Sequence, residues 1–177
     1  ENNAGIQGFI FNTRKGIFQN KKVREAITYA FDFKWSNKNL FYNQYQRCTS
    51  FFSNSELSAN IKPSDKERKL AQKLSIPENK IVNKNLSFIN ESSDIRENLK
   101  KAKNIFDALG WKVKKNILYD DNDNPVEFDF LLAQKGFERI LAPFAKNLNK
   151  LGIRLNYRTI DVSLYQRRVD TFDFDMM

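Results

Sequence analysis

Residues 8–32, GFIFNTRKGIFQNKKVREAITYAFD, join a short extended pattern to an amphipathic helical pattern. The bulky apolar residues of 8–13 and the shortness of that run predict a strand. Asn20 is a favoured N-cap residue, and it stands before a segment whose apolar side chains fall on one helical face. A strand followed closely by an amphipathic helix is typical of α/β proteins.

Helical and extended patterns continue outward from this stretch to residue 177. Helices are predicted over 35–42, 64–74, 94–109, 137–150 and 162–170, and strands over 111–119, 126–132, 153–160 and 172–177. Pro143 falls inside one helix and predicts either a kink or a later start. Residues 43–62 follow neither period and are predicted to form an ordered loop with a short extended piece. This order predicts an α/β fold with a mixed sheet and flanking helices.

Residues at the ends of the predicted helices support these assignments. Candidate N-caps precede the later helices: Asp32 or Ser36, Ser64, Ser93 or Asp94, and Asp161. Gly110 and Gly152 stand where helix C-terminal glycines belong.

The composition excludes several kinds of catalytic site. The 177 residues contain no His, which removes Ser–His–Asp and Cys–His arrangements, a His general base and His-liganded zinc. The single cysteine, Cys48, can form neither an intrachain disulfide nor a Cys-rich metal cluster. No apolar run is long enough to cross a bilayer. We therefore expect one α/β domain without a catalytic site, a cofactor or a metal.

The net charge of +9 admits two interpretations. A nucleic-acid-binding domain would carry such a charge gathered on one face. The lysines here are not collected in one run or on one helical face, which favours a scattered, solvated distribution. The sequence therefore predicts no nucleic-acid partner, and a basic nucleic-acid-binding domain is kept as the alternative function.

Residues 8–32 also resemble a recurring segment of the bacterial extracellular solute-binding proteins of the oligopeptide and dipeptide type, family 5. In that segment a strand with Asn near its end leads through a short turn into a helix of the pattern VR-x-A-[IL]-x-x-A-[FL]-D. The matching residues are Asn12, Phe18, Asn20, Val23, Arg24, Ala26, Ile27, Ala30 and Asp32. Tracts that resemble the YejA-like branch of the family, associated with peptide and peptide-antibiotic uptake, include ALGWKVKKN (108–116), FDFLLAQKGFERILAPFAKNLNKLGI (128–153) and YQRRVDTFDFDM (165–176).

This resemblance implies a two-lobed periplasmic binding protein type II-like fold, in which residues 1–177 form one α/β lobe, the later-inserted one. Such a protein closes on a peptide or peptide-like ligand and delivers it to ABC permease subunits in the inner membrane. We therefore expect a periplasmic location and a second lobe outside this chain. A terminal strand at 172–177 without a partner agrees with the expectation of a longer chain.

The predicted helix 162–170 carries the first candidate binding residues. Related binding proteins place a cleft-facing arginine in this helix, five residues before the Phe of the closing strand, and Arg167 has that spacing from Phe172. A planar guanidinium there could grip a peptide carboxylate or carbonyl groups. Leu164, one turn earlier, could line the same wall. The alternative is that Arg167 is an ordinary solvated helix residue.

The tract 45–56, YQRCTSFFSNSE, is the second candidate. It combines aromatic surface with hydroxyl and amide groups, and peptide recognition needs both. The candidate cleft residues within it are Tyr45, Arg47, Phe51, Ser53 and Asn54. The alternative is that Phe51 and Phe52 only anchor the loop to the core.

Three further features lie in or next to predicted strands. Asn12 and Arg14 come after the first strand, and strand ends in α/β lobes commonly face the ligand crevice, so a cleft or hinge role is predicted for both. Residues 120–125, DDNDNP, superficially resemble a Ca²⁺ loop but lack its Gly and its bidentate Glu, so a turn is predicted. Asp173 and Asp175 alternate and are predicted to form a polar strand face rather than an acid/base pair.

Overall fold

The computed structural model describes residues 6–48, 52–53, 55, 63–77 and 94–177, which group into two compact units. The first unit comprises Glu1–Gln7 and Gln46–Asn90, and the second comprises Gly8–Tyr45 and Glu91–Met177. Of the helices in the described ranges, none has both the length and the apolar character needed to cross a bilayer. The prediction that 1–177 forms one lobe stays a prediction.

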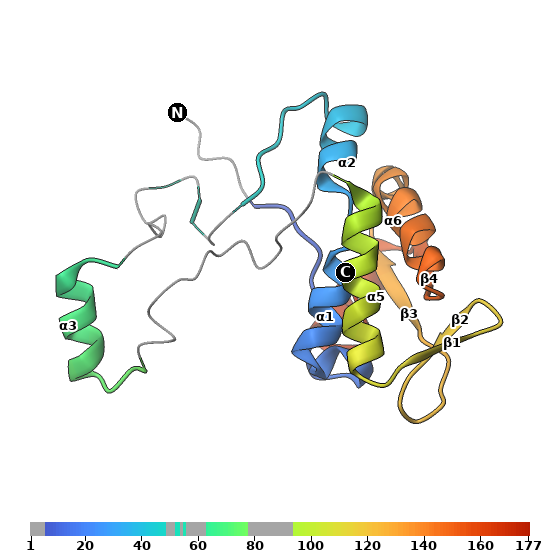
Figure 1. Ribbon diagram of the computed structural model, residues 1–177. Helices are drawn as coiled ribbons and strands as arrows, with labels where there is room; N and C mark the ends of the chain where they lie inside the picture. The colour runs from blue at the N-terminus through green and yellow to red at the C-terminus, as the bar shows by residue number, and fades with distance from the viewer. Residues whose placement is uncertain (1–5, 49–51, 54, 56–62, 78–93) are drawn as a thin grey trace. The chain divides into compact units, whose positions relative to one another are not determined.

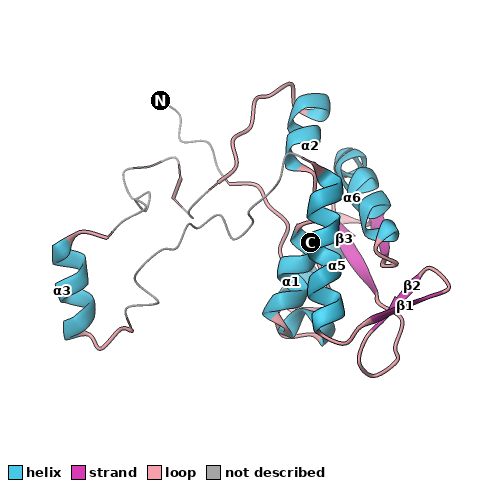
Figure 2. Ribbon diagram, viewed as in Figure 1, coloured by secondary structure: helices cyan, strands magenta, loops and turns pink. Residues whose placement is uncertain are grey.

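The second unit holds most of the regular structure (Figures 1 and 2). Its elements are η1 (Gly16–Gln19), α1 (Lys21–Thr28), α2 (Phe33–Leu40), α5 (Ile95–Ala108), β1 (Lys112–Lys114), β2 (Ile117–Tyr119), β3 (Glu127–Leu132), η2 (Lys135–Phe137), α6 (Glu138–Lys150), β4 (Arg154–Thr159) and α7 (Val162–Asp170). In the first unit the structure describes α3 (Asp65–Lys73).

The predicted N-caps are confirmed, and both open choices are resolved. The Asn20 side chain accepts from the Lys22 backbone N–H at the start of α1. Asp32 caps α2, whereas Ser36 lies buried inside that helix. Asp94 caps α5, and the predicted alternative at position 93 lies outside the described residues. The helix predicted over 137–150 begins at Glu138, with Pro143 inside it.

A parallel pair of strands forms the centre of the second unit. β3 pairs with β4 in register from Glu127 opposite Arg154 to Leu132 opposite Thr159, and α6 connects them as a crossover helix. Met176 widens this layer on the β3 side, because it forms a parallel β-bridge with Phe130 and an antiparallel β-bridge with Phe11. The layer therefore runs from the segment around Phe11, through the segment around Met176, to β3 and β4.

Two predicted strands are wrong in their extent. Residues 8–13 and 172–177 were expected as full strands, but each contributes only isolated bridges. Phe172 has a left-handed backbone, with φ of 54°, which no continuing strand adopts. The Asn12 side chain also donates hydrogen bonds to the backbone carbonyl groups of residues 172 and 174. In a regular strand, such groups would accept from the backbone of a neighbouring strand.

The strand predicted over 111–119 is also wrong, because the stretch forms the β1–β2 hairpin. Lys115 and Asn116 have φ of 49° and 64°, and they make a two-residue turn between paired strands. Asn tolerates the left-handed region, but Lys is not a typical turn residue there. Of the two turn residues, only Asn116 therefore indicated a hairpin in the sequence.

Aromatic rings fill the core between the sheet layer and its helices. The ring of Phe9 lies 5.2 Å from that of Phe31, 4.9 Å from that of Phe130 and 5.6 Å from that of Phe144, measured between centroids. Phe144 belongs to the apolar stripe of α6, which buries Ile140, Leu141, Phe144 and Leu148. This packing places α6 on the face of the sheet that carries Phe130.

Among the described residues of the first unit, Asp65–Lys73 form the helix α3. The Ser64 hydroxyl accepts from the Glu67 backbone N–H, and the Glu67 carboxylate accepts from the Ser64 backbone N–H at 2.6 Å, which completes a capping box. The Ser64 hydroxyl also donates to the Glu67 carboxylate at 2.7 Å, and this bond and the bond from the Ser64 backbone lower the pKa of Glu67. In the tract predicted as an ordered loop, residues 49–51, 54 and 56–62 lie outside the described part.

Candidate functional site

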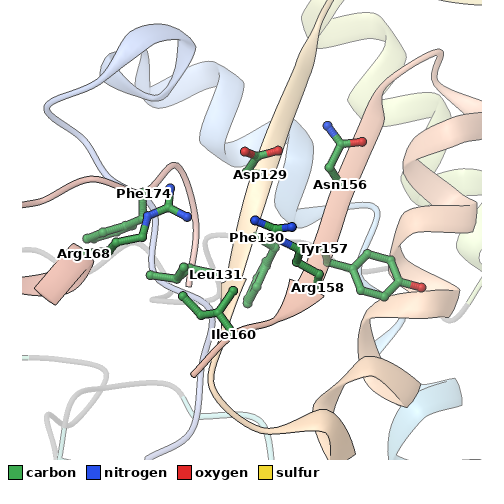
Figure 3. Close-up of a pocket in the computed structure, with 9 residues that line it drawn as sticks. All are labelled: Asp129, Phe130, Leu131, Asn156, Tyr157, Arg158, Ile160, Arg168 and Phe174. Carbon is green, nitrogen blue, oxygen red and sulfur yellow. The ribbon is translucent and has the colours of Figure 1, made fainter. Parts of the chain in front are cut away.

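A groove of about 310 Å³ lies within the second unit, against β3, β4 and α7 (Figure 3). It is lined by Asp129, Phe130, Leu131, Asn156, Tyr157, Arg158, Ile160, Arg168 and Phe174. Side chains alternate along a strand, so Asp129 and Leu131 point away from the face that Phe130 presents to α6. Residues of β3 and β4 therefore supply most of this lining, and α7 supplies Arg168.

Arg168 is the groove residue with the best-defined position. Its Nε donates to the Asp173 carbonyl oxygen at 2.8 Å and to the Asp173 carboxylate at 3.1 Å. Both bonds use the same edge of the guanidinium. The two terminal nitrogens have no hydrogen-bond partner among the described residues, and they remain able to bind a carboxylate.

Arg158 and Asn156 project from alternate positions of β4. Both are exposed, and within the described part of the chain neither side chain has a hydrogen-bond or ion-pair partner. Figure 3 shows Leu131 and Ile160 between Arg158 and Arg168. A guanidinium on each side of an apolar floor is suited to a small solute that carries both a carboxylate and apolar groups.

An acidic side chain completes the lining. The exposed Asp129 lies on β3, and its backbone N–H donates to the Asp175 carboxylate at 3.0 Å. Its own carboxylate could accept from an ammonium or amide N–H of a solute. The groove therefore offers groups of both signs, as a zwitterionic ligand would require.

Asn12 lies beside this groove but turns its polar atoms toward the protein. It is 4% exposed, and its Nδ2 donates to the Phe172 carbonyl at 2.9 Å and to the Phe174 carbonyl at 2.8 Å. Its Oδ1 accepts from the Arg14 backbone N–H at 3.1 Å. The Arg14 guanidinium stacks 3.6 Å from the ring centroid of Phe172. The structure thus brings both predicted residues to the segment that ends in the groove residue Phe174.

The structure places Arg167 and Leu164 on α7, outside the groove lining. Arg167 is exposed, Leu164 is half-buried, and the neighbouring Arg168 lines the groove instead. The roles of Arg167 and Leu164 in a cleft stay predictions. Reasoning from the sequence did not select Arg168, although an acidic residue five positions later, Asp173, was an available signal.

The candidates in the 45–56 tract are divided between the two units. Tyr45 belongs to the second unit, where the Asn37 side chain donates to its carbonyl at 2.8 Å and accepts from its N–H at 3.0 Å. Arg47 and Ser53 belong to the first unit. The remaining candidates, Phe51 and Asn54, lie outside the described residues. Binding roles for this tract stay predictions.

The turn predicted at 120–125 is confirmed. The Asp120 carboxylate accepts from the backbone N–H groups of Asn122 at 2.9 Å and Asn124 at 2.8 Å. Partial desolvation acts to raise the pKa of Asp120, but the hydrogen bonds from Asn124 and Asn122 outweigh it and leave that pKa lowered. In the ranges that the structure describes, no three acidic, His or Cys side chains are grouped to hold a metal.

Asp173 and Asp175 do not form a paired acid/base site. Asp173 binds Arg168, whereas Asp175 forms an ion pair with Lys15 at 3.1 Å and accepts from the Asp129 N–H. Each carboxylate therefore has a separate basic partner, and both hold the chain around 172–177 in place.

The second unit thus combines a parallel β-α-β layer with a groove that carries charged side chains. The model of the bacterial extracellular solute-binding proteins, family 5 Middle, matches residues 1–177, and the chain belongs to that family. The expectations of this family and of its α/β fold are therefore confirmed, and the matched family is one of solute-binding proteins rather than enzymes.

Three relatives show the range of names within the family. A probable peptide-binding protein YejA of Agrobacterium fabrum is 35% identical over 97% of this chain and 28% of its own length. A protein named YejA from Escherichia coli is 33% identical over 94% of this chain and 28% of its own length. A peptidoglycan-binding protein YepA of Agrobacterium fabrum is 30% identical over 98% of this chain and 29% of its own length. The chain thus spans less than a third of each of these relatives.

Solved structures share the fold at low sequence identity. The oligopeptide-binding protein AppA of Bacillus subtilis, solved with a nonapeptide, has a TM-score of 0.67 and 21% identity over 96% of this chain and 29% of its own. The murein tripeptide-binding protein MppA, in an unliganded open form, has a TM-score of 0.64 and 17% identity over 95% of this chain and 27% of its own.

Proposed function

We propose that this chain is part of the substrate-binding component of an ABC importer. The component captures peptides or peptide-like solutes in a cleft between two lobes and delivers them to a membrane permease from the periplasm. The observation that carries the proposal is the family match over residues 1–177, together with relatives named for peptide or peptidoglycan binding.

The chemistry of the groove supports a peptide-like ligand. Arg158 and the free edge of Arg168 suit a carboxylate, Asp129 suits an ammonium group, and the buried Leu131 and Phe174 suit apolar side chains. A short peptide carries all of these groups. A ligand that contacts both lobes would stabilise the closed state relative to the open state. Binding is coupled to domain closure in this way.

No specific observation favours the nucleic-acid alternative. Basic side chains in the described ranges pair with acidic neighbours in six places: Lys15–Asp175, Lys22–Glu25, Lys103–Asp107, Lys114–Asp123, Arg154–Glu127 and Arg168–Asp173. Such mixed pairing offers less attraction to a phosphate backbone than a single basic face would.

Calorimetry on the full-length natural protein tests this function. We expect short peptides with a free C-terminal carboxylate to bind, and we expect Arg158→Gln to weaken their binding about tenfold or more, because a charge-assisted hydrogen bond is lost. Arg154→Gln is the matched control: Arg154 is also an exposed residue of β4, but it pairs with Glu127 and does not line the groove. Absence of binding to every short peptide tested would overturn the proposal.

A further inference from the structure

Three successive backbone carbonyls, at residues 172, 173 and 174, each accept a hydrogen bond from a side chain. The Phe172 and Phe174 carbonyls accept from the single Nδ2 of Asn12. The Asp173 carbonyl between them accepts from Nε of Arg168 at 2.8 Å. The segment is therefore held from one side by Asn12 and from the other side by the arginine of the groove.

We infer that Asn12 is a positioning residue for the groove. It fixes the 172–174 segment, and that segment in turn fixes the guanidinium of Arg168 and presents the ring of Phe174 to a ligand. This inference rests on the proposed function, because it assumes that the groove receives a solute. Asn12 itself is buried and has its polar atoms engaged within the protein, so it acts through Arg168 and Phe174.

The backbone at Phe172 explains why such a residue is needed. Phe172 has φ of 54°, a conformation that is unfavourable for a bulky side chain and persists only where the surroundings enforce it. The bond from Asn12 to its carbonyl and the Arg14 guanidinium stacked on its ring, 3.6 Å from the centroid, both enforce it. The Asn12 side-chain oxygen Oδ1 also accepts from the Arg14 backbone N–H, so one side chain organises both supports.

An amide is the group that fits this position. Asn12 uses two N–H donors on one nitrogen for two carbonyl groups and one oxygen as the acceptor for Arg14. Aspartate would place a carboxylate against two carbonyl oxygens, and leucine has nearly the same shape but no polar atom. Asn12→Leu therefore removes the hydrogen bonds with the smallest change in volume.

The test compares Asn12→Leu with Asn147→Leu in the full-length natural protein. Asn147 is also buried, and its Nδ2 donates to the Ala30 carbonyl at 3.0 Å, but it lies on α6 and does not line the groove. Affinity is measured for a short peptide with a free C-terminal carboxylate and for the same peptide with a C-terminal amide. We expect Asn12→Leu to reduce the preference for the carboxylate about tenfold, and Asn147→Leu to leave that preference unchanged.

A second readout does not depend on a ligand. In the 177-residue chain, nuclear magnetic resonance follows exchange of the Arg168 Nε–H, which Asp173 protects. We expect Asn12→Leu to speed this exchange and Asn147→Leu not to change it. If wild-type protein binds no peptide, the proposed function fails while this exchange still tests the positioning. Unchanged exchange in Asn12→Leu, or an equal loss of carboxylate preference in both variants, would overturn the inference.

Discussion

Gly110 and Gly152 have the same backbone conformation in different surroundings. Each follows the C-cap residue of a helix, α5 or α6, with φ of 81°. A Cβ added at Gly110 would meet nothing within 4 Å. A Cβ at Gly152 would lie 2.6 Å from the backbone nitrogen of Leu118, which donates to the Gly152 carbonyl at 2.9 Å. The two glycines therefore separate the cost of the conformation from the cost of close approach.

We expect Gly110→Ala to lower the free energy of unfolding by about 1 kcal/mol, the cost of a left-handed alanine. Gly152→Ala should lower it by roughly 3 kcal/mol, because β2 must also move away from the new methyl group. Urea unfolding of both variants measures the difference. Equal losses would show that β2 gives way freely at Gly152.

Residues that act on their immediate neighbours were predictable from the sequence. Asn20, Ser64 and Asp161 are caps that need only the next few residues, and each cap was found where it was predicted. The selection of Arg168 over Arg167 was not predictable in this way. It depends on which side of α7 faces β3 and β4, and that follows from packing rather than from spacing along one helix.

The cap of α7 makes this helix sensitive to acid. Hydrogen bonds from the backbone N–H groups of Ser163 and Leu164 lower the pKa of Asp161 below its ordinary value of 3.8. A lowered pKa in the folded state means that the charged cap stabilises α7 above the ordinary pKa and that this contribution is lost as pH falls through the lower, folded-state pKa.

We therefore expect the amides of α7 to lose protection against hydrogen exchange as pH falls from above the ordinary Asp pKa of 3.8 through the lower, folded-state pKa. Asp161→Asn should lose several-fold less, since Asn caps nearly as well and does not titrate. Protection factors at each pH, which correct for intrinsic exchange, measure this effect. The same acid dependence in both proteins would assign it to another group.

Element types were predicted well where the periodic pattern was long. The 3.6-residue period of α6 and the two-residue period of β4 were enough to predict a helix and a strand. The predicted bounds of both elements agree with the observed bounds within about two residues. The predictions for 8–13 and 172–177 were wrong in extent because distant contacts decide them. Phe11 and Met176 form a β-bridge although they lie near opposite ends of the sequence. Beside this bridge, the Asn12 side chain, instead of a strand backbone, donates to the Phe172 carbonyl.

For the whole chain, the fold class was predictable but the division into units was not. Alternating strands and helices indicate an α/β layer, and the resemblance of residues 8–32 named the family that the comparisons confirm. The grouping of 46–90 apart from the second unit depends on contacts that no local period records. The groove likewise joins β3, β4, α7 and Phe174, which are separate segments in the sequence.

The 177-residue chain should bind short peptides weakly by itself. Ligand sites of binding proteins bury most of the ligand surface, whereas the groove of the second unit is an open surface feature of about 310 Å³. The chain also spans only 28% of its relative from Agrobacterium fabrum, and in a two-lobed protein the opposite wall would supply the remaining contacts. We expect dissociation constants weaker than about 1 mM in calorimetry with mixed short peptides. Micromolar or tighter binding by the chain alone would show that a second wall is not needed for capture.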